Sequence, residues 1–252
     1  MRKPVPILLT SSVIAHDQSV ALTDTAERTK HALESIEAWQ RIAPEHALVI
    51  CDGSGFDFSP LMTSQFPGAQ IESLHFLNNA GLVAQYGRGY GEGEIVKFAL
   101  AHSTTIASAG CFAKCTSKLW VENFKQCLDQ WNDKLMLKGV FLNIFSPLKK
   151  SQFHHIDTRF YIANLDVYKE LFLDAHLNIC RERGHGLEEC FRDIVLSQQL
   201  QEILTSCPPI IAGRGGGTGA YYRNPRHRVW KEAVRTRFVM HTPKFRKLFI
   251  RK

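Results

Sequence analysis

Residues 47–55, which read ALVICDGSG, decide the fold of this chain. The first five residues are apolar, and a turn sequence of Asp, Gly and Ser follows them at once. A short apolar run bounded by turn residues predicts a strand buried on both faces. Strands of this kind are typical of parallel sheets that are covered by helices.

The segments around this strand repeat the pattern. Residues 5–13, 71–77, 111–115, 137–145 and 153–163 are predicted as further strands, and residues 26–39, 93–102, 165–175 and 187–204 as helices. Either Thr23 or Asp24 is expected to cap the first helix. The alternation predicts an α/β fold, with a mostly parallel sheet and helices on both of its faces. We expect one domain over residues 1–222 and a basic amphipathic C-terminal segment over residues 223–252.

Composition narrows the class of protein. The chain has 252 residues, of which 44% are hydrophobic and 22% charged, so disorder and coiled coil are excluded as its main organisation. It has no apolar run of 18 residues, and its basic start lacks the features of a signal peptide. The seven cysteines are irregularly spaced and are expected to be reduced thiols, and the Cys111/Cys115 pair is a weak zinc signal.

Charge is concentrated near the C-terminus. From Arg214 onward the chain carries 12 Lys and Arg residues and a single acid, Glu232. Trp and Phe side chains are interleaved with these cations, as in segments that lie in a layer of lipid headgroups. The segment therefore predicts an anionic partner, either a membrane surface or a nucleic acid, although a solvated helix that completes the fold would also explain it.

The predicted strand ends carry the first candidate site residues, because ligands of parallel sheets bind beyond the carboxyl ends of the strands. Ser11 follows the first strand, and Asp52, Gly53 and Ser54 follow the second. The aspartate could accept hydrogen bonds from a base or a ribose, and the glycine would allow a ligand to approach the backbone. An Asp-Gly turn with no ligand is the alternative.

Three further stretches fit the same donor-binding role. Gly89, Gly91 and Glu92 belong to a glycine-rich run expected to be a loop that feeds a helix, and its acids favour a neutral sugar over a phosphate. Lys114 and Lys118 lie on the fourth strand and just after it, where they could neutralise a pyrophosphate. Arg214 lies in a second glycine-rich run that could close over a diphosphate.

The second half of the chain carries candidates for catalysis and for acceptor binding. Glu188 and Glu189 open a predicted helix, and the first of them is the preferred general base; Asp157 is a further candidate. His155 and Arg159 are candidates for acceptor binding. A metal site near the His154-His155 pair is an alternative, but neighbouring residues of a regular strand point to opposite faces, so at most one of these histidines should join Asp157.

In this order the features resemble a GT-A-type glycosyltransferase of bacterial surface-polysaccharide (capsule) or lipopolysaccharide biosynthesis. Residues 50–55 resemble the nucleotide-binding start of that fold, and residues 78–101 its donor-side loop and helix. Residues 112–120 stand where the family places an Asp-x-Asp metal motif, but the chain contains no such motif. The resemblance implies a GT-A-like, Rossmann-like sheet, a nucleotide-sugar donor, a glycan or lipid-linked acceptor, and transfer with inversion.

Lys114 and Lys118 hold the place of the missing motif. We therefore expect a metal-independent enzyme without a cofactor, in which fixed cations offset the charge of the leaving diphosphate. The expected location is cytoplasmic, peripheral to the inner face of the membrane. An alternative is a nucleic-acid-binding or nucleotide-modifying α/β protein, but the sequence has no recognisable nucleic-acid motif. A Rossmann-type dinucleotide enzyme would need a glycine fingerprint after the first strand, and residues 10–12 are not one.

Overall fold

The computed structural model of the chain describes residues 4–17, 20–217 and 219–251. Residues 1–3 of the basic N-terminal segment, residues 18–19, Thr218 of the second glycine-rich run and Lys252 of the tail lie outside the described residues.

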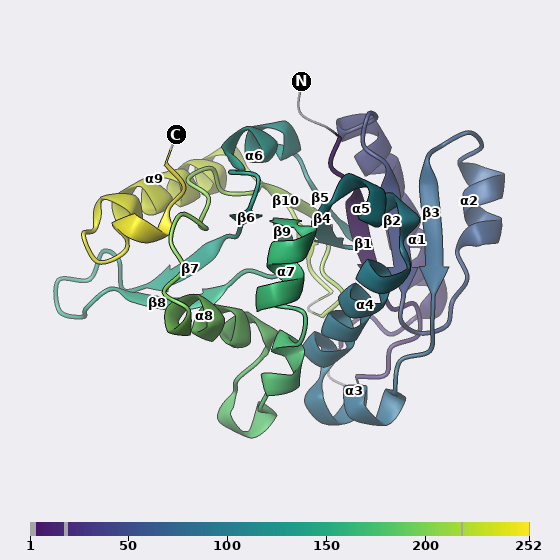
Figure 1. The fold of residues 1–252 in the computed structure, drawn as a ribbon, viewed down its shortest axis with the longest axis horizontal. Coiled ribbons are helices and arrows are strands. Elements are labelled where there is room, and N and C mark those ends of the chain that lie inside the picture. Colours follow the sequence, from purple (N-terminus) through teal and green to yellow (C-terminus); the bar gives the residue numbers. More distant parts are fainter. Residues whose placement is uncertain (1–3, 18–19, 218, 252) are drawn as a thin grey trace.

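The central sheet has six strands in the order β3-β2-β1-β4-β9-β6 (Figure 1). Four neighbours in this order run parallel: β3 (Ile71–His75), β2 (Leu48–Asp52), β1 (Ile7–Ser11) and β4 (Cys111–Thr116). Strand β9 (Phe160–Asn164) is antiparallel to both β4 and β6 (Leu135–Met136). Every residue of β1 and β2 is buried, as expected for strands covered on both faces. The predicted mostly parallel α/β sheet is confirmed.

Helices cover both faces of the sheet. Consecutive side chains of β1 point to opposite faces, so each face has its own core. Ile7 and Leu9 join one core cluster and Leu8 joins the other. The first cluster is closed by α1 (Thr25–Ile42), α2 (Ser59–Gln65) and α6 (Phe124–Gln130), and the second by α3 (Ala80–Tyr86), α4 (Arg88–His102), α5 (Thr104–Ala109), α7 (Leu165–Leu171) and α8 (Leu187–Ser197). Asp24 caps α1 by accepting a hydrogen bond from the Glu27 N–H at 2.7 Å.

Two smaller sheets flank the central one. One contains β5 (Leu119–Val121), β10 (Ile211–Arg214) and β11 (Tyr221–Tyr222), and the other is the hairpin of β7 (Gly139–Leu142) and β8 (Gln152–Ile156). Three short 3-10 helices, η1 (Ala175–Asn178), η2 (Arg181–Arg183) and η3 (Arg246–Leu248), complete the described elements together with α9 (Arg226–His241).

Several predicted boundaries were wrong, and four of them bear on the site. The strand predicted over 137–145 is shorter, because only residues 139–142 form β7, and the alternating run 153–163 is divided between β8 and β9 by residues 157–159. The helix predicted to begin at Gly93 begins at Arg88, so the first glycine-rich run is helical. The helix predicted to reach Leu204 ends at Ser197, where the chain turns and Gln199 adopts a positive φ of 51°.

The C-terminal segment folds back onto the body of the protein. After α9, the buried side chains of Phe245 and Phe249 enter the same core cluster as Leu8, together with Val239 of α9. Phe249 also forms a parallel bridge with Leu204. Figure 1 shows α9 beside the β7–β8 hairpin. No helix among the described residues is both long enough and apolar enough to cross a membrane.

Candidate active site

A cavity of about 540 Å³ opens at the carboxyl ends of the parallel strands. Thr10 and Ser11 of β1, Gly53 after β2 and Thr116 of β4 form its floor. Its walls are formed by the β7–β8 hairpin, by α9 and by the glycine loop of residues 215–217. This is the edge of the sheet at which parallel α/β proteins bind their ligands.

The cavity brings together many of the residues singled out from the sequence. Those that line it are Ser11, Gly53, Gly91, Glu92, Lys118, His155, Asp157, Arg159 and Glu188. Those outside its lining are Asp52, Ser54, Gly89, Lys114, Glu189 and Arg214. Most residues of the second group form hydrogen bonds, ion pairs or packing contacts that hold them outside the lining.

Asp52 ties two loops together beneath the cavity. Its Oδ2 accepts a hydrogen bond from the Val13 N–H at 2.9 Å, and its Oδ1 accepts from the backbone N–H and the hydroxyl of Ser54 at 2.7 and 2.6 Å. The Ser54 Oγ in turn accepts from the Ile14 N–H at 2.9 Å. Both side chains therefore hold the segment after β1 against the segment after β2, as in the turn that the sequence left open as the alternative.

The glycines of α4 serve close helix packing. A Cβ on Gly93 would lie 2.3 Å from the Cβ of His176 in η1, and a Cβ on Gly89 would lie 3.0 Å from the Cβ of Leu187 in α8. The contact at Gly93 is shorter than real Cβ contacts, so this position needs glycine, whereas an alanine at position 89 would require Leu187 to shift slightly. The loop expected here is instead the start of a helix that packs tightly on its neighbours, and Gly91 alone of the predicted glycines in this run reaches the cavity.

Lys114 is buried and paired. Its ammonium group forms an ion pair with Glu92 and donates a hydrogen bond to the Thr158 carbonyl oxygen at 2.8 Å. This pairing offsets the cost of burying a lysine in β4. Glu92 reaches the cavity, whereas Lys114 lies behind it.

Lys118 and Arg28 form a cationic pair at the cavity floor. Lys118 is 3% exposed, and burial followed by the nearby charge of Arg28 lowers its pKa to about 7. The Arg28 guanidinium donates to the carbonyl oxygens of Ser12 and Leu22, at distances between 2.5 and 2.8 Å. No described residue forms an ion pair with Lys118. Two desolvated cations side by side favour a bound anion.

The glycine loop covers this pair. A Cβ on Gly216 would lie 2.9 Å from Cε of Lys118, and Gly217 rests against the Arg88 guanidinium. The carbonyl oxygens of Gly216 and Gly217 accept hydrogen bonds from the N–H groups of residues 22 and 21 at 3.3 and 3.2 Å. Arg214 precedes the loop, and its Nε is buried without a hydrogen-bond partner among the described residues.

The two glutamates of α8 have different environments. Glu189 accepts a hydrogen bond from the Gly186 N–H at 2.9 Å and thereby caps its own helix. Glu188 lines the cavity, where burial first and then the charges of Glu92 and Glu189 raise its pKa. A carboxyl group with a raised pKa inside a cavity suits a general base.

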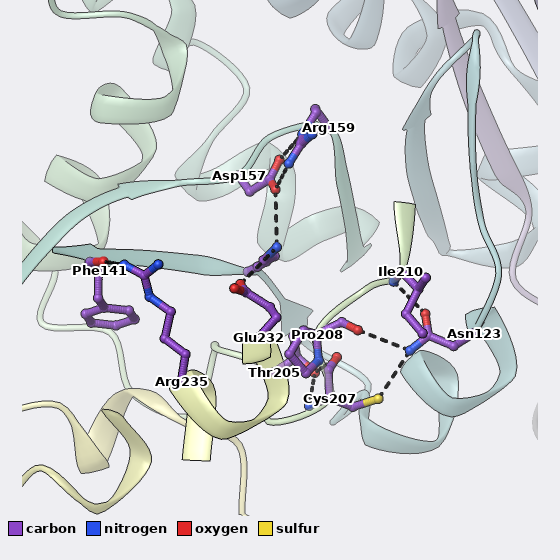
Figure 2. A network of polar contacts seen from close by, with 11 residues as sticks. Asn123, Phe141, Asp157, Arg159, Thr205, Cys207, Pro208, Ile210, Glu232 and Arg235 are labelled. Carbon is purple, nitrogen blue, oxygen red and sulfur yellow. Dashed lines mark hydrogen bonds and ion pairs between the residues drawn. The ribbon is translucent and has the colours of Figure 1, made fainter. Parts of the chain in front are cut away.

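Asp157 belongs to a chain of ion pairs that reaches α9 (Figure 2). Arg159 donates to both of its oxygens, at 2.8 and 2.5 Å, and Lys138 Nζ lies 3.8 Å from Oδ2 of Asp157 and 3.3 Å from Oε1 of Glu232. Burial alone would raise the pKa of Asp157, but Arg159 and then Lys138 outweigh it and lower the pKa to about 2. Its carboxylate is therefore a weak base.

Several lining residues were missed by sequence reasoning: Arg28, Arg88, Lys138, Glu232 and Arg235. Arg28 could have been found from the sequence, because its spacing places it on the apolar side of α1 with Ala32, Ile36 and Trp39. Arg235 reaches the cavity only because α9 packs back onto the body of the protein, and no local pattern in the sequence predicts this packing. Figure 2 shows Arg235 donating to the Phe141 carbonyl oxygen, and Asn123 holding the Cys207–Ile210 segment beside the lining residues Thr205 and Pro208.

His154 and His155 lie on the same side of their strand, which corrects the expectation that they face apart. In the β7–β8 hairpin His155 pairs with Val140 and Phe153 pairs with Phe141, so His154 is an extra residue in a β-bulge. A bulge re-aims side chains. The two Nδ1 atoms are 2.6 Å apart, and with Glu189 these side chains form the one group of three potential metal ligands found among the described residues.

The fold and the cavity define the class of protein as an α/β protein with a ligand pocket at the ends of a mostly parallel sheet. No protein-family model matches the chain, and no curated protein matches its sequence. Three solved structures show what the fold is similar to. A protein of Desulfovibrio desulfuricans G20 named as a nucleotide-diphospho-sugar transferase is 10% identical, with a TM-score of 0.47 over 81% of this chain and 80% of that one.

The second is a 4-diphosphocytidyl-2C-methyl-D-erythritol synthase, which is 13% identical with a TM-score of 0.44 over 93% of this chain and 99% of that one. The third is mouse xyloside xylosyltransferase 1, which is 9% identical with a TM-score of 0.39 over 80% of this chain and 83% of that one. Similarity at this level assigns no function, so a function must come from the residues of the cavity.

Proposed function

We propose that this chain is a glycosyltransferase that moves a sugar from a nucleotide-sugar donor to a glycan or lipid-linked acceptor. The observation that carries the proposal is the buried Lys118–Arg28 pair, which lies at the strand ends in the same cavity as Glu188. The pair suits the diphosphate of a nucleotide sugar, and the glutamate suits the activation of an acceptor hydroxyl.

Buried groups at the cavity floor support a polar ligand. The hydroxyl oxygens of Thr10 and Ser11 are buried and have no hydrogen-bond partner among the described residues. Buried polar groups are rarely left unpaired in a native state with its ligand bound. These hydroxyls, with the cations beside them, suit the polar groups of a nucleotide and its phosphates.

The reaction is a single displacement. The acceptor oxygen attacks the anomeric carbon, the bond from that carbon to the phosphate oxygen breaks, and the acceptor proton passes to Glu188. The leaving diphosphate carries away the electron pair, and Lys118 with Arg28 offsets its negative charge. Attack from the face opposite the leaving group inverts the anomeric centre. Asp157 takes no proton, because its ion pair with Arg159 holds its pKa at about 2.

Donor binding in this scheme is metal-independent. The Asp-x-Asp metal motif is absent from the sequence, and the residues at the corresponding place do not fit a divalent cation, because Lys114 and Lys118 are themselves cationic. Fixed ammonium and guanidinium groups supply the positive charge that the leaving group requires.

The side chains of α9 support the proposal that the acceptor is lipid-linked and lies at an anionic membrane face, as in surface-polysaccharide or lipopolysaccharide synthesis. Arg235, Thr236 and Val239 face the cavity. A second side of the helix exposes Trp230, Val234 and Phe238 at intervals of four residues, in a segment rich in arginine and lysine. Exposed aromatic side chains among cations favour the headgroup layer of an anionic bilayer.

Thermal unfolding in the presence of a panel of nucleotides and nucleotide sugars, each with EDTA and with Mg²⁺ or Mn²⁺, tests the proposal. We expect one nucleotide family to raise the unfolding midpoint equally under all three conditions, since binding to the native state stabilises it. A shift that needs metal would overturn the metal-independent donor site. No shift with any nucleotide, beside a clear shift with RNA or DNA, would replace the proposal with nucleic-acid binding.

A further inference from the structure

We propose that His154, His155 and Glu189 bind one divalent ion of the zinc class at the rim of the cavity. This site is separate from the Lys118–Arg28 pair. It goes beyond the proposed transferase function, and it can be tested without any sugar substrate.

The β-bulge in the β7–β8 hairpin creates the histidine pair. A regular strand would send these two side chains to opposite faces, but His154 is the unpaired extra residue between the pairs Phe153–Phe141 and His155–Val140. The imidazole rings therefore meet, with their centroids 4.9 Å apart and their Nδ1 atoms 2.6 Å apart. Bulges of this kind occur next to active sites, where they re-aim side chains.

Helix α8 supplies the third ligand. It packs against β8, and Glu189 lies in its first turn. One carboxylate oxygen, Oε2, accepts the Gly186 N–H, so the other oxygen is not needed for the cap. One potential ligand atom from each of the three residues lies within 4.8 Å of the other two.

The donor set favours zinc over magnesium. Two imidazole nitrogens and one carboxylate are ligands typical of catalytic zinc sites, whereas magnesium prefers oxygen ligands. Zinc–nitrogen bonds of about 2.0–2.1 Å place two tetrahedral nitrogen ligands roughly 3.3 Å apart. The two rings would therefore need to separate by a fraction of an ångström from their spacing of 2.6 Å.

The site would leave a coordination position for a further ligand. Three protein ligands with an open fourth position characterise catalytic rather than structural zinc sites. His155 lines the cavity, and Glu188 lies beside Glu189 at the start of α8. A bound ion would thus be adjacent to the proposed general base and able to bind an oxygen of the second substrate.

Titration of the chelator-treated chain with Co²⁺ and with Zn²⁺ tests the site. We expect one equivalent to bind, with the visible ligand-field bands of a nitrogen- and oxygen-ligated Co²⁺. The double variant His154→Ala/His155→Ala and the single variant Glu189→Gln should each lose affinity by about tenfold or more. Glutamine can still accept the Gly186 N–H, so Glu189→Gln preserves the helix cap and carries the test if the double variant fails to fold.

The matched control is His185→Ala. This histidine lies just before α8 and pairs with Asp193 at 3.2 Å, outside the cluster, so its loss should leave metal affinity unchanged. Binding that survives in Glu189→Gln and in a folded double variant would overturn the site. Thiolate charge-transfer bands would likewise assign the ion to cysteines such as Cys127 and Cys207 and overturn it. Absence of stoichiometric binding to the natural chain would also overturn it.

Discussion

Lys118 Nζ and Arg28 Nη1 approach the same point beneath the glycine loop, at 3.8 and 3.9 Å from where a Cβ of Gly216 would lie. One cation comes from the segment after β4 and the other from α1, and their mutual repulsion contributes to the lowered pKa of Lys118. An arrangement that costs stability in the free protein becomes favourable when an anion binds.

Replacing Lys118 by methionine should weaken binding of the nucleotide diphosphate by tenfold or more, because a charge-assisted hydrogen bond is worth about 1.5–3 kcal/mol. Isothermal titration calorimetry measures the effect. Lys125→Met is the matched control, since Lys125 is exposed on α6 and away from the cavity. Unchanged affinity in Lys118→Met would place the diphosphate elsewhere.

The stability of the ligand-free chain should rise with pH relative to Lys118→Met. The folded-state pKa of Lys118 is about 7 and the ordinary value is 10.5, so between these pH values the unfolded chain holds the extra proton. The free energy of unfolding therefore increases with pH in this window, by up to about 1.4 kcal/mol per pH unit. Urea unfolding of both proteins at pH 7, 8 and 9 measures the difference. A flat difference would show that Lys118 is charged normally in the folded state.

Glu188→Gln should lower turnover by about a hundredfold or more and leave donor affinity unchanged, because general-base catalysis contributes about 10²–10⁴ in rate. The raised pKa of Glu188 also predicts that natural turnover falls as pH drops through that value, since the protonated acid accepts no proton. Steady-state kinetics with the donor identified by thermal unfolding measure both effects. Glu182→Gln, at an exposed glutamate of η2, is the control. Turnover of Glu188→Gln at the level of the unsubstituted chain would remove the general-base role from Glu188.

Trp230→Ser/Phe238→Ser should reduce binding to vesicles rich in an anionic phospholipid by fivefold or more, since two exposed aromatic side chains would no longer enter the headgroup layer. Vesicle sedimentation measures the binding, and donor affinity should not change. Leu177→Ser, at an exposed leucine of η1, is the control. Equal binding by both variants and the natural chain would exclude this side of α9 as the membrane contact.

The parallel strands and the longer helices α1, α4 and α8 could be predicted because their signals are local, whereas the short helices α2, α3, α5 and α6 were not predicted. The apolar runs of β1, β2 and β4 and the helical spacing of α1 depend on burial alone, and a parallel sheet buries its strands on both faces. The glycine-rich run 87–93 misled for a physical reason. Glycine is unfavourable inside a helix by about 1 kcal/mol, so it predicts a loop, but the close packing of α4 on His176 requires glycine at position 93.

The features of the candidate site also fall into two groups, those that the sequence predicts and those that depend on the tertiary structure. The sequence by itself determined that polar residues stand at the strand ends, because they follow apolar runs directly, and this placed Ser11, Gly53 and Lys118 at the cavity. Only the tertiary structure decided that Lys114 is neutralised by Glu92, that Arg28 joins Lys118, and that α9 forms a wall. Each of these depends on contacts between residues far apart in the chain, and local patterns along a sequence do not reveal such contacts.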